Sequence, residues 1–301
     1  MYTGMEAVLF LQELRLSMPQ WMESLFLFVS SPVFYVMLPM LIGALSYWFV
    51  SKRNGETIFF SISLAMAASR SLKFMIKQPR PWMLDPSVEP SQSAMKGATT
   101  YSLPSGHTSI SVSAYASIFR LVESRYIRAF CILMIVLIPF SRVFLGVHTP
   151  LDIAVGFIVG IAVFLINNKV VPWSYENERN RMVYLVGYSV FFVLCTIVIL
   201  LLGGDVRSID FLGLGLGLTV GLLIDGRYIH HDVISADLRG MTAMAVIGFV
   251  ISGILFIIPY FAMGTGFGSM LGGFLFMLSV TVICPLIFRK IGSGAEAPGS
   301  E

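Results

Sequence analysis

Two histidines and one carboxylate are the residues of this chain best suited to catalysis. His148 and Asp152 are four residues apart, and Pro150 between them suits the first turn of a helix. On a helix this spacing brings the carboxylate within reach of the imidazole and fixes the tautomer of the ring. A histidine oriented in this way is a good nucleophile or base. The pair by itself also fits a polar contact that closes a helix turn.

The second histidine ends a short segment with the sequence PSGH, residues 104–107. Ser105 and Gly106 precede an apolar run, so the free N–H groups and the positive dipole end of a helix would face an anion there. His107 supplies a titratable group beside them. A capped helix with a histidine at the membrane surface is the alternative for these four residues alone.

Three basic side chains lie inside apolar runs or at their ends. Lys73 and Arg80 are seven residues apart, about two helical turns, so both can project from one face of a helix. Their alternative role is contact with lipid headgroups at the end of a span. Arg142 interrupts another apolar run, where an unpaired charge is costly, and therefore needs an anionic partner.

Composition places these residues in a membrane protein. Of the 301 residues, 56% are hydrophobic and only 12% are charged, and the mean hydropathy is +0.82. Too few polar side chains remain to cover a water-soluble fold of this size. The net charge of +3 is too small to indicate nucleic acid, so we expect no nucleic-acid partner.

Apolar runs of sufficient length predict an all-α polytopic transmembrane helix bundle with about nine spans. The runs lie near residues 32–50, 56–77, 105–122, 128–146, 151–170, 182–203, 209–226, 241–262 and 268–290. Loops rich in Lys and Arg fall on one side of this arrangement, which the positive-inside rule identifies as cytoplasmic. The residues suited to chemistry all map to the other side. We therefore expect a multi-pass protein of the cell (inner or plasma) membrane with a site on its extracytoplasmic face.

The same pattern predicts five parts of the chain. An interfacial amphipathic segment at 1–31 precedes a membrane core at 32–171, a cytoplasmic linker at 172–181, C-terminal transmembrane helices at 182–290 and a disordered tail at 291–301. The C-terminal helices form about four spans beyond the core. They carry no chemical motif, and we expect them to act in scaffolding or substrate access.

Three cations and two histidines at one membrane level describe a phosphate site. No cluster of carboxylates accompanies them, because Asp152 is needed by His148 and both Asp85 and Glu89 lie in a loop. Mg²⁺ is bound through carboxylates, and a Zn²⁺ site here would also need a carboxylate beside the two histidines. The sequence therefore predicts metal-independent chemistry without a cofactor.

Together, the three clusters resemble the signature of the type 2 phosphatidic acid phosphatase (PAP2) superfamily. Residues 73–81 read KxxxxxxRP, residues 104–107 read PSGH and residues 141–152 read SRxxxxxHxxxD. The resemblance covers roughly residues 20–170 and implies a PAP2-like core in an integral-membrane phosphatase that acts through a phosphohistidine.

The resemblance also implies a role for each motif residue. His148 would attack phosphorus, oriented by Asp152, and His107 would protonate the leaving group and then activate water. The remaining motif residues would bind the phosphoryl oxygens, and they are Lys73, Arg80, Ser105, Gly106 and Arg142.

A site at the membrane surface, together with the resemblance, favours a lipid phosphate as the substrate and the bilayer as the partner. Candidate substrates are phosphatidic acid, phosphatidylglycerophosphate, undecaprenyl pyrophosphate and lipid A phosphates. A sugar phosphatase similar to glucose-6-phosphatase and a vanadate-dependent haloperoxidase are the enzymatic alternatives. A lipid-phosphate transporter or flippase, which binds without hydrolysis, is the alternative from another class.

Two further patterns resemble ligand sites. Gly213 and Gly217 belong to a glycine-rich apolar run for which we predict close helix packing, not dinucleotide binding. For His230, His231 and Asp232 we predict a solvated cytoplasmic turn, not a metal cluster.

Overall fold

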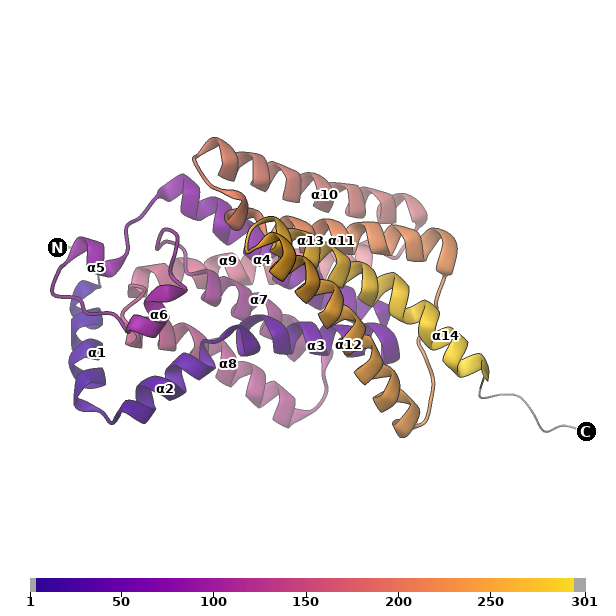
Figure 1. Ribbon diagram of the computed structural model, residues 1–301, viewed down its shortest axis with the longest axis horizontal. Coiled ribbons are helices and arrows are strands. Elements are labelled where there is room, and N and C mark those ends of the chain that lie inside the picture. The colour runs from indigo at the N-terminus through magenta and orange to yellow at the C-terminus, as the bar shows by residue number, and fades with distance from the viewer. Residues whose placement is uncertain (1–3, 295–301) are drawn as a thin grey trace, which may run out of the picture. The chain divides into compact units, whose positions relative to one another are not determined.

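The computed structural model describes residues 4–294 (Figure 1). Every regular element in that range is helical, which confirms the predicted all-α class. The tail predicted at 291–301 begins inside the last described helix, and its remainder at 295–301 lies outside the described residues.

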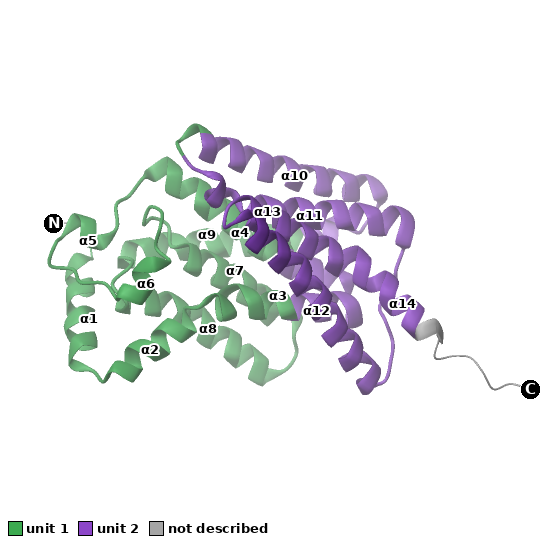
Figure 2. Cartoon of the chain, viewed as in Figure 1, with its two compact units in different colours: residues 1–41, 60–169, 201–203 green, residues 42–59, 170–200, 204–301 purple. Residues whose placement is uncertain are grey.

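The chain divides into two compact units, shown in green and purple in Figure 2. Unit 1 comprises residues 1–41, 60–169 and 201–203. Unit 2 comprises residues 42–59, 170–200 and 204–301. Much of the core predicted at 32–171 coincides with unit 1, but residues 42–59 group with unit 2.

Unit 1 contains the N-terminal helices and most of two long helices. Its elements are α1 (Met5–Ser17), α2 (Gln20–Val29), the π-helical turn η1 (Val33–Met37), α5 (Pro81–Leu84), α6 (Gln92–Lys96), α7 (Gly106–Leu121), α8 (Arg125–Phe144) and most of α4 (Lys52–Ile76) and α9 (Pro150–Ser174).

Unit 2 contains the C-terminal helices and the larger part of α3. Its elements are α3 (Leu38–Phe49), α10 (Glu178–Leu201), the short turns η2 (Val206–Ile209), η3 (Asp225–Ile229) and η4 (Ser279–Ile283), and the helices α11 (Phe211–Ile224), α12 (Leu238–Met263), α13 (Phe267–Leu278) and α14 (Cys284–Gly294).

Eight helical stretches of the described chain are long and apolar enough to cross a membrane. They are Gln20–Phe49, Lys52–Leu84, Arg125–Phe144, Pro150–Ser174, Glu178–Leu201, Val206–Ile229, Leu238–Met263 and Phe267–Ile291. The protein is therefore a polytopic helix bundle, as predicted. The first of these stretches begins with α2, which is the second half of the predicted interfacial segment, and runs on through η1.

The span predicted at 105–122 differs from the other eight. Its helix α7 has 16 residues and is not among the stretches long and apolar enough to cross a membrane. Four of its serines are buried inside the protein, and they are Ser109, Ser111, Ser113 and Ser117. Three of these serines, Ser109, Ser111 and Ser117, donate hydrogen bonds to carbonyl oxygens within α7 or at its N-cap. A helix buried among protein groups in this way does not need the hydropathy of a lipid-facing span.

Close packing of α9 on α7 brings together the PSGH motif, at the start of α7, and the HxxxD motif, at the start of α9. A Cβ atom added at Gly156 would lie 2.9 Å from Thr108 Cβ, and one added at Gly160 would lie 2.8 Å from the Ser109 carbonyl oxygen. Side chains at these positions would separate the helices, so glycine is required for this approach.

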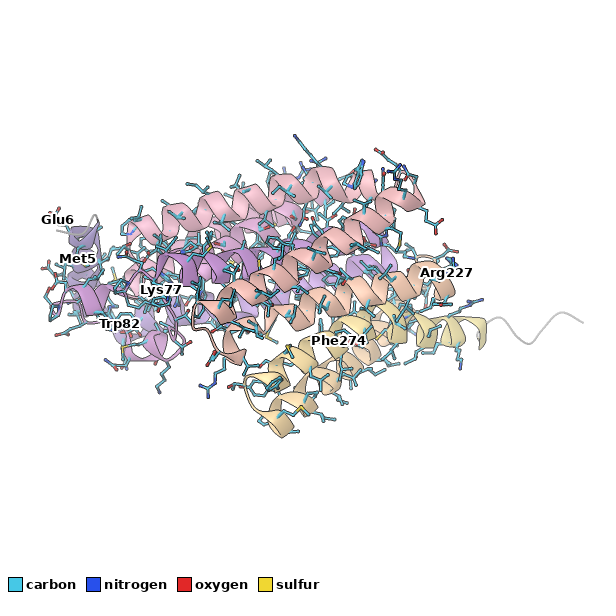
Figure 3. All side chains as sticks on the ribbon, turned by 90° about the horizontal axis from the view of Figure 1, so that it is seen from above. Met5, Glu6, Lys77, Trp82, Arg227 and Phe274 are labelled. Atoms are coloured by element: carbon cyan, nitrogen blue, oxygen red, sulfur yellow. The ribbon has the colours of Figure 1, made fainter. Side chains whose placement is uncertain are left out.

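Glycines of α11 have the packing role that the sequence predicts. A Cβ atom at Gly213 would collide with the backbone of Met270, and one at Gly217 would lie 2.5 Å from the carbonyl oxygen of Phe274, which is labelled in Figure 3. Helices α11 and α13 therefore pack backbone to backbone, and the prediction of close helix packing is confirmed.

The first helix is anchored to unit 1 by a small apolar cluster. Met5, Val8, Val88 and Val143 are buried together, and Trp82 packs against them. Met5 and Trp82 are both labelled towards the left of the view in Figure 3. This cluster fixes the segment that follows α4 and leads towards the PSGH residues.

Candidate active site

The two residues of the HxxxD motif form a buried dyad at the start of α9. His148 Nδ1 lies 3.2 Å from Asp152 Oδ2, and their exposed fractions are 2% and 1%. Since the carboxylate is an acceptor only, the ring donates from Nδ1 and keeps its lone pair on Nε2. The histidine therefore presents Nε2 as its reactive nitrogen.

Two further residues orient the Asp152 carboxylate. Ser102 Oγ donates to Asp152 Oδ2 at 2.6 Å, and the backbone N–H of Thr149 donates to the same oxygen at 2.8 Å. Ser102 Oγ also lies 3.4 Å from His148 Nδ1. The carboxylate is thus held by three donors, which fixes the plane of the imidazole opposite it.

The turn before His148 depends on one glycine. Gly146 lies between α8 and α9 and has φ of +74°, a left-handed conformation that favours glycine. A Cβ atom there would lie 3.1 Å from Pro90 Cα. The turn lets the chain leave α8 and present His148 immediately before α9 begins.

Lys73, in the last turn of α4, and Arg80, which immediately precedes α5, bind backbone carbonyls around the dyad. Arg80 Nε donates to the Thr100 carbonyl at 2.8 Å, and Arg80 Nη1 donates to the Val147 carbonyl at 2.9 Å. The same Nη1 lies 3.0 Å from His148 Nε2, which accepts from it. Arg80 therefore contacts the reactive nitrogen directly.

Lys73 holds the loop that carries Ser102. Its Nζ donates to the carbonyl of Tyr101 at 2.5 Å and to the carbonyl of Ser102 at 2.9 Å. The lysine is 5% exposed, and both of these acceptors are uncharged. Its charge therefore adds to the field around the dyad.

Arg142 is the most deeply buried of the three cations. It lies in the last turn of α8 with an exposed fraction of 4%, and Nη1 donates to Ser30 Oγ at 3.1 Å. Its Nε is buried without a hydrogen-bond partner. A buried guanidinium with an unused N–H donor can bind an anion through that donor.

The PSGH segment is joined to the dyad through its backbone. The N–H of Ser105 donates to the carbonyl of Asp152 at 3.0 Å. Ser105 caps α7, and its Oγ lies 3.0 Å from Thr108 Oγ1. Gly106 begins the helix, and a Cβ atom added there would meet Ser69 Oγ at an ordinary 3.7 Å. The free N–H groups at the start of α7 are therefore close to the dyad.

His107 follows on the first turn of α7 and is partly exposed. It is close enough to interact electrostatically with Arg142, His148, Arg80 and Lys73. The ring of Tyr35, from η1, lies 4.2 Å from the imidazole, measured between ring centroids. His107 and His148 therefore belong to one cluster, and each has a different neighbour that orients its ring.

The cations keep His148 neutral. Burial lowers the pKa of His148 well below its usual value, and the positive charges of Arg80, Lys73 and Arg142 lower this pKa further. The neutral ring has a free lone pair on Nε2 at physiological pH. Three cations around one carboxylate leave an excess of positive charge, which an oxyanion would balance.

All the residues predicted to form the site lie in unit 1, at the ends of α4 and α8 and at the starts of α5, α7 and α9. They are Lys73, Arg80, Ser105, Gly106, His107, Arg142, His148 and Asp152. Their catalytic and phosphate-binding roles remain predictions. In the part of the chain that the structure describes, no three His, Cys, Asp or Glu side chains are grouped so as to hold a metal ion.

Sequence reasoning did not identify four residues that contact this cluster. Ser102 and Thr149 adjoin the motifs, so a search for small polar residues next to PSGH and HxxxD would have found them. Ser30 and Tyr35 carry no such signal, because they lie in a segment predicted to be interfacial and far from the motifs in sequence.

The three clusters occur on one continuous segment that a family model also covers. Residues 56–176 match the PAP2 superfamily. The resemblance stated from the motifs is confirmed for this PAP2-like segment, which includes both histidines and the three cations. Ser30 and Tyr35 precede it.

A curated relative covers part of the same chain. It is an undecaprenyl-diphosphatase from Sulfolobus acidocaldarius, 34% identical over 110 residues. The alignment includes 36% of this chain and 52% of the relative, so the chain spans about half the length of the protein it matches. No solved structure matches the chain.

Proposed function

We propose that this chain is an integral-membrane phosphatase that hydrolyses phosphomonoester or diphosphate groups of lipid substrates through a phosphohistidine on His148. The observation that carries this proposal is the environment of the buried His148. Its Nδ1 lies beside the Asp152 carboxylate, its Nε2 lies beside the Arg80 guanidinium, and the cluster has excess positive charge. The cluster pairs a nucleophile with the charge that phosphoryl transfer requires.

In the first step, His148 Nε2 attacks phosphorus and the bond to the leaving alcohol or phosphate breaks. In the free protein Arg80 Nη1 donates a hydrogen bond to Nε2. When the substrate binds, Nη1 must donate to a phosphoryl oxygen instead, which leaves Nε2 available for the attack. Asp152 stabilises the positive charge that develops on the ring. His107, when protonated, donates a proton to the departing oxygen.

In the second step, water displaces His148 from the phosphoryl group. His107, left neutral by the first step, takes a proton from the attacking water, and inorganic phosphate leaves with the P–N bond broken. Lys73, Arg142 and the N–H groups at the start of α7 balance the charge on the equatorial oxygens in both steps. Each histidine returns to its initial protonation state.

A lipid diphosphate is the substrate class with the most support. The curated relative is named as an undecaprenyl-diphosphatase, and eight helical stretches within residues 4–294 are apolar enough to cross a membrane. The loops rich in Lys and Arg lie opposite the site in the predicted topology, which favours an extracytoplasmic active site.

Phosphate release by the purified full-length protein tests the proposal. The panel contains undecaprenyl diphosphate, phosphatidic acid, phosphatidylglycerophosphate, a lipid A phosphate and glucose 6-phosphate, each with and without EDTA. We expect release from a lipid substrate that persists in EDTA and is lost in His148→Ala. Asp85→Asn, in the exposed turn after α5, is the matched control and should keep wild-type activity.

Three results would overturn the proposal. Undiminished release by His148→Ala would exclude this nucleophile, and loss of activity in EDTA that Mg²⁺ restores would exclude metal-independent chemistry. Movement of labelled lipid phosphate across liposomes without any phosphate release would favour a transporter.

A further inference from the structure

The segment before the PAP2-like segment reaches two of the proposed catalytic residues. It consists of α2, the residues that follow it and η1, and we refer to residues 20–37 as the N-terminal arm. Ser30 Oγ accepts a hydrogen bond from Arg142 Nη1 at 3.1 Å, and the ring of Tyr35 lies 4.2 Å from that of His107. The arm therefore contacts a phosphate-binding cation and the proposed general acid.

Two contacts outside the site hold the arm in place. The ring of Phe26 lies 4.3 Å from that of Phe144 at the end of α8, measured between centroids. Tyr115 of α7 donates its hydroxyl to the Phe34 carbonyl at 2.6 Å, next to Tyr35. The π-helical turn η1 then presents Tyr35 to His107, in keeping with the frequent occurrence of such turns at functional sites. The arm is thus a packed part of unit 1.

The bond to Ser30 determines which edge of Arg142 remains available. Nη1 is engaged by Ser30, whereas the buried Nε has no partner. A guanidinium donates in a fixed fork, so a contact on one nitrogen sets the direction of the others. Ser30 therefore orients the unused Nε for an incoming phosphoryl oxygen.

The ring of Tyr35 determines the plane of His107. The two rings are inclined at 47°, so Tyr35 covers one side of an imidazole that is otherwise partly exposed. Burial, and then the positive charges of Arg142, Arg80 and Lys73, lower the pKa of His107 well below its usual value and so oppose its protonation. The face of an aromatic ring attracts a cation, so Tyr35 offsets part of that repulsion when His107 carries its proton.

We propose that Ser30 and Tyr35 are positioning residues of the active site, Ser30 acting through Arg142 on phosphate binding and Tyr35 acting through His107 on leaving-group departure. The inference rests on the proposed function. It extends the catalytic unit to a part of the chain that lies before residues 56–176.

Steady-state kinetics of Tyr35 variants test the proposed role of Tyr35. We expect Tyr35→Leu to lower kcat about 10-fold, because it would weaken but not abolish general-acid catalysis by His107. KM should change less than about twofold. Tyr35→Phe keeps the ring and should stay within about twofold of wild type. Phe34→Ala removes the neighbouring ring, which contacts Phe28, and is the matched control.

Wild-type kcat in Tyr35→Leu would overturn the role of Tyr35. So would an equal loss in Phe34→Ala, since that result would indicate a general disturbance of η1. An equal loss in Tyr35→Phe would exclude the aromatic ring as the active part.

The phosphate affinity of Ser30 variants tests the proposed role of Ser30. Ser30→Ala should raise the inhibition constant of inorganic phosphate about 2- to 10-fold, the loss expected for one hydrogen bond to a charged group. Ser30→Thr keeps the hydroxyl and should restore affinity. Ser24→Ala, on the exposed face of α2, is the matched control, because Ser24 Oγ donates to the Gln20 carbonyl of its own helix.

Calorimetric binding of orthovanadate and of inorganic phosphate separates this inference from the proposed function. If the wild-type protein binds both anions but releases no phosphate from any substrate, the proposed function fails, and weaker binding by Ser30→Ala still supports the inference. Equal affinity in Ser30→Ala and wild type would overturn the role of Ser30. Absence of anion binding by the wild-type protein would overturn both.

Discussion

The two units each contain a buried histidine bonded through Nδ1 to a buried aspartate, but the charges around the two pairs differ. In unit 1, His148 lies 3.2 Å from Asp152, and Arg80, Lys73 and Arg142 lower the pKa of the histidine. In unit 2, His231 lies 2.6 Å from Asp225, and Lys52 forms an ion pair with the same carboxylate.

A neighbouring pair in unit 2 is balanced in the same way. Arg181 binds both oxygens of the buried Glu56 at 2.7 Å, and Tyr175 donates to Glu56 Oε1 at 2.6 Å. Asp225 and Glu56 thus have one cation each, whereas three cations lie around the His148–Asp152 pair in unit 1. We propose that surplus positive charge is what distinguishes a phosphate-binding His–Asp pair from a neutralised, structural one.

The same substitution at the two aspartates should separate these roles most strongly. Asp152→Asn places an amide opposite His148 and favours the tautomer that carries its proton on Nε2, which removes the nucleophilic lone pair. By analogy with other oriented histidines we expect phosphate release to fall about 10³- to 10⁴-fold. Asp225→Asn should keep the wild-type rate per folded molecule.

The second aspartate should instead affect stability. Removing the charge of Asp225 leaves Lys52 without its ion-pair partner, and we expect a loss of about 3 kcal/mol, at the low end for buried pairs because Lys52 is a quarter exposed. Thermal unfolding in detergent measures this effect. A large fall in the turnover of folded Asp225→Asn would contradict the distinction between the two pairs.

Arginine substitutions sharpen the comparison at the next level of effect. Arg80→Gln removes a cation that contacts His148 Nε2, and we expect kcat/KM to fall about 10²- to 10³-fold, as for the loss of other oxyanion-stabilising groups. Arg181→Gln, which removes the partner of Glu56, should lower the unfolding temperature and leave kcat/KM of the folded protein unchanged. Similar kinetic losses in both variants would show that the surplus charge is not the decisive feature.

Ser102→Ala should have a smaller effect than either change. It removes one of the three donors to Asp152 Oδ2 and leaves the carboxylate and His148 in place. We expect kcat to fall about 10-fold, the value of one neutral-to-charged hydrogen bond. Ser102→Thr keeps the hydroxyl and should recover most of this loss, while an unchanged kcat in Ser102→Ala would exclude Ser102 as a positioning residue.

The pH dependence gives the smallest predicted effect. Because the pKa of His148 is lowered, the acidic limb of kcat/KM should lie below the usual range of a histidine, with activity rising as His148 loses its proton. Lys73→Met removes one positive charge that opposes protonation. The pKa of His148 should then rise and the acidic limb should move to higher pH, and a shift to lower pH would have the wrong sign.

The sequence was sufficient to predict the spans and the motif residues, because both signals are local. Apolar runs identify membrane helices, and Lys73, Arg80, His107, Arg142 and His148 lie at helix ends that the topology brings to one level. α7 was the exception among the spans. Its small and polar residues are buried among helices, and a hydropathy pattern does not distinguish that environment from lipid.

Contacts between distant parts of the chain were not predictable in this way. Ser30 meets Arg142 across 112 residues, and no periodic pattern encodes that approach. The prediction of a solvated turn at 230–232 was wrong for His231, which is 6% exposed. His230 has φ of +48° and reverses the chain, so that His231 returns to Asp225 six residues earlier.

Trapping of the phosphorylated enzyme tests the central claim most directly. The purified protein is mixed with undecaprenyl diphosphate labelled in its terminal phosphate, or with the best substrate of the panel, and quenched in alkali, in which phosphohistidine survives. The account predicts label on His148 that forms before free phosphate and is absent in His148→Ala. Phosphate release without labelled protein, or label that remains in His148→Ala, would contradict it.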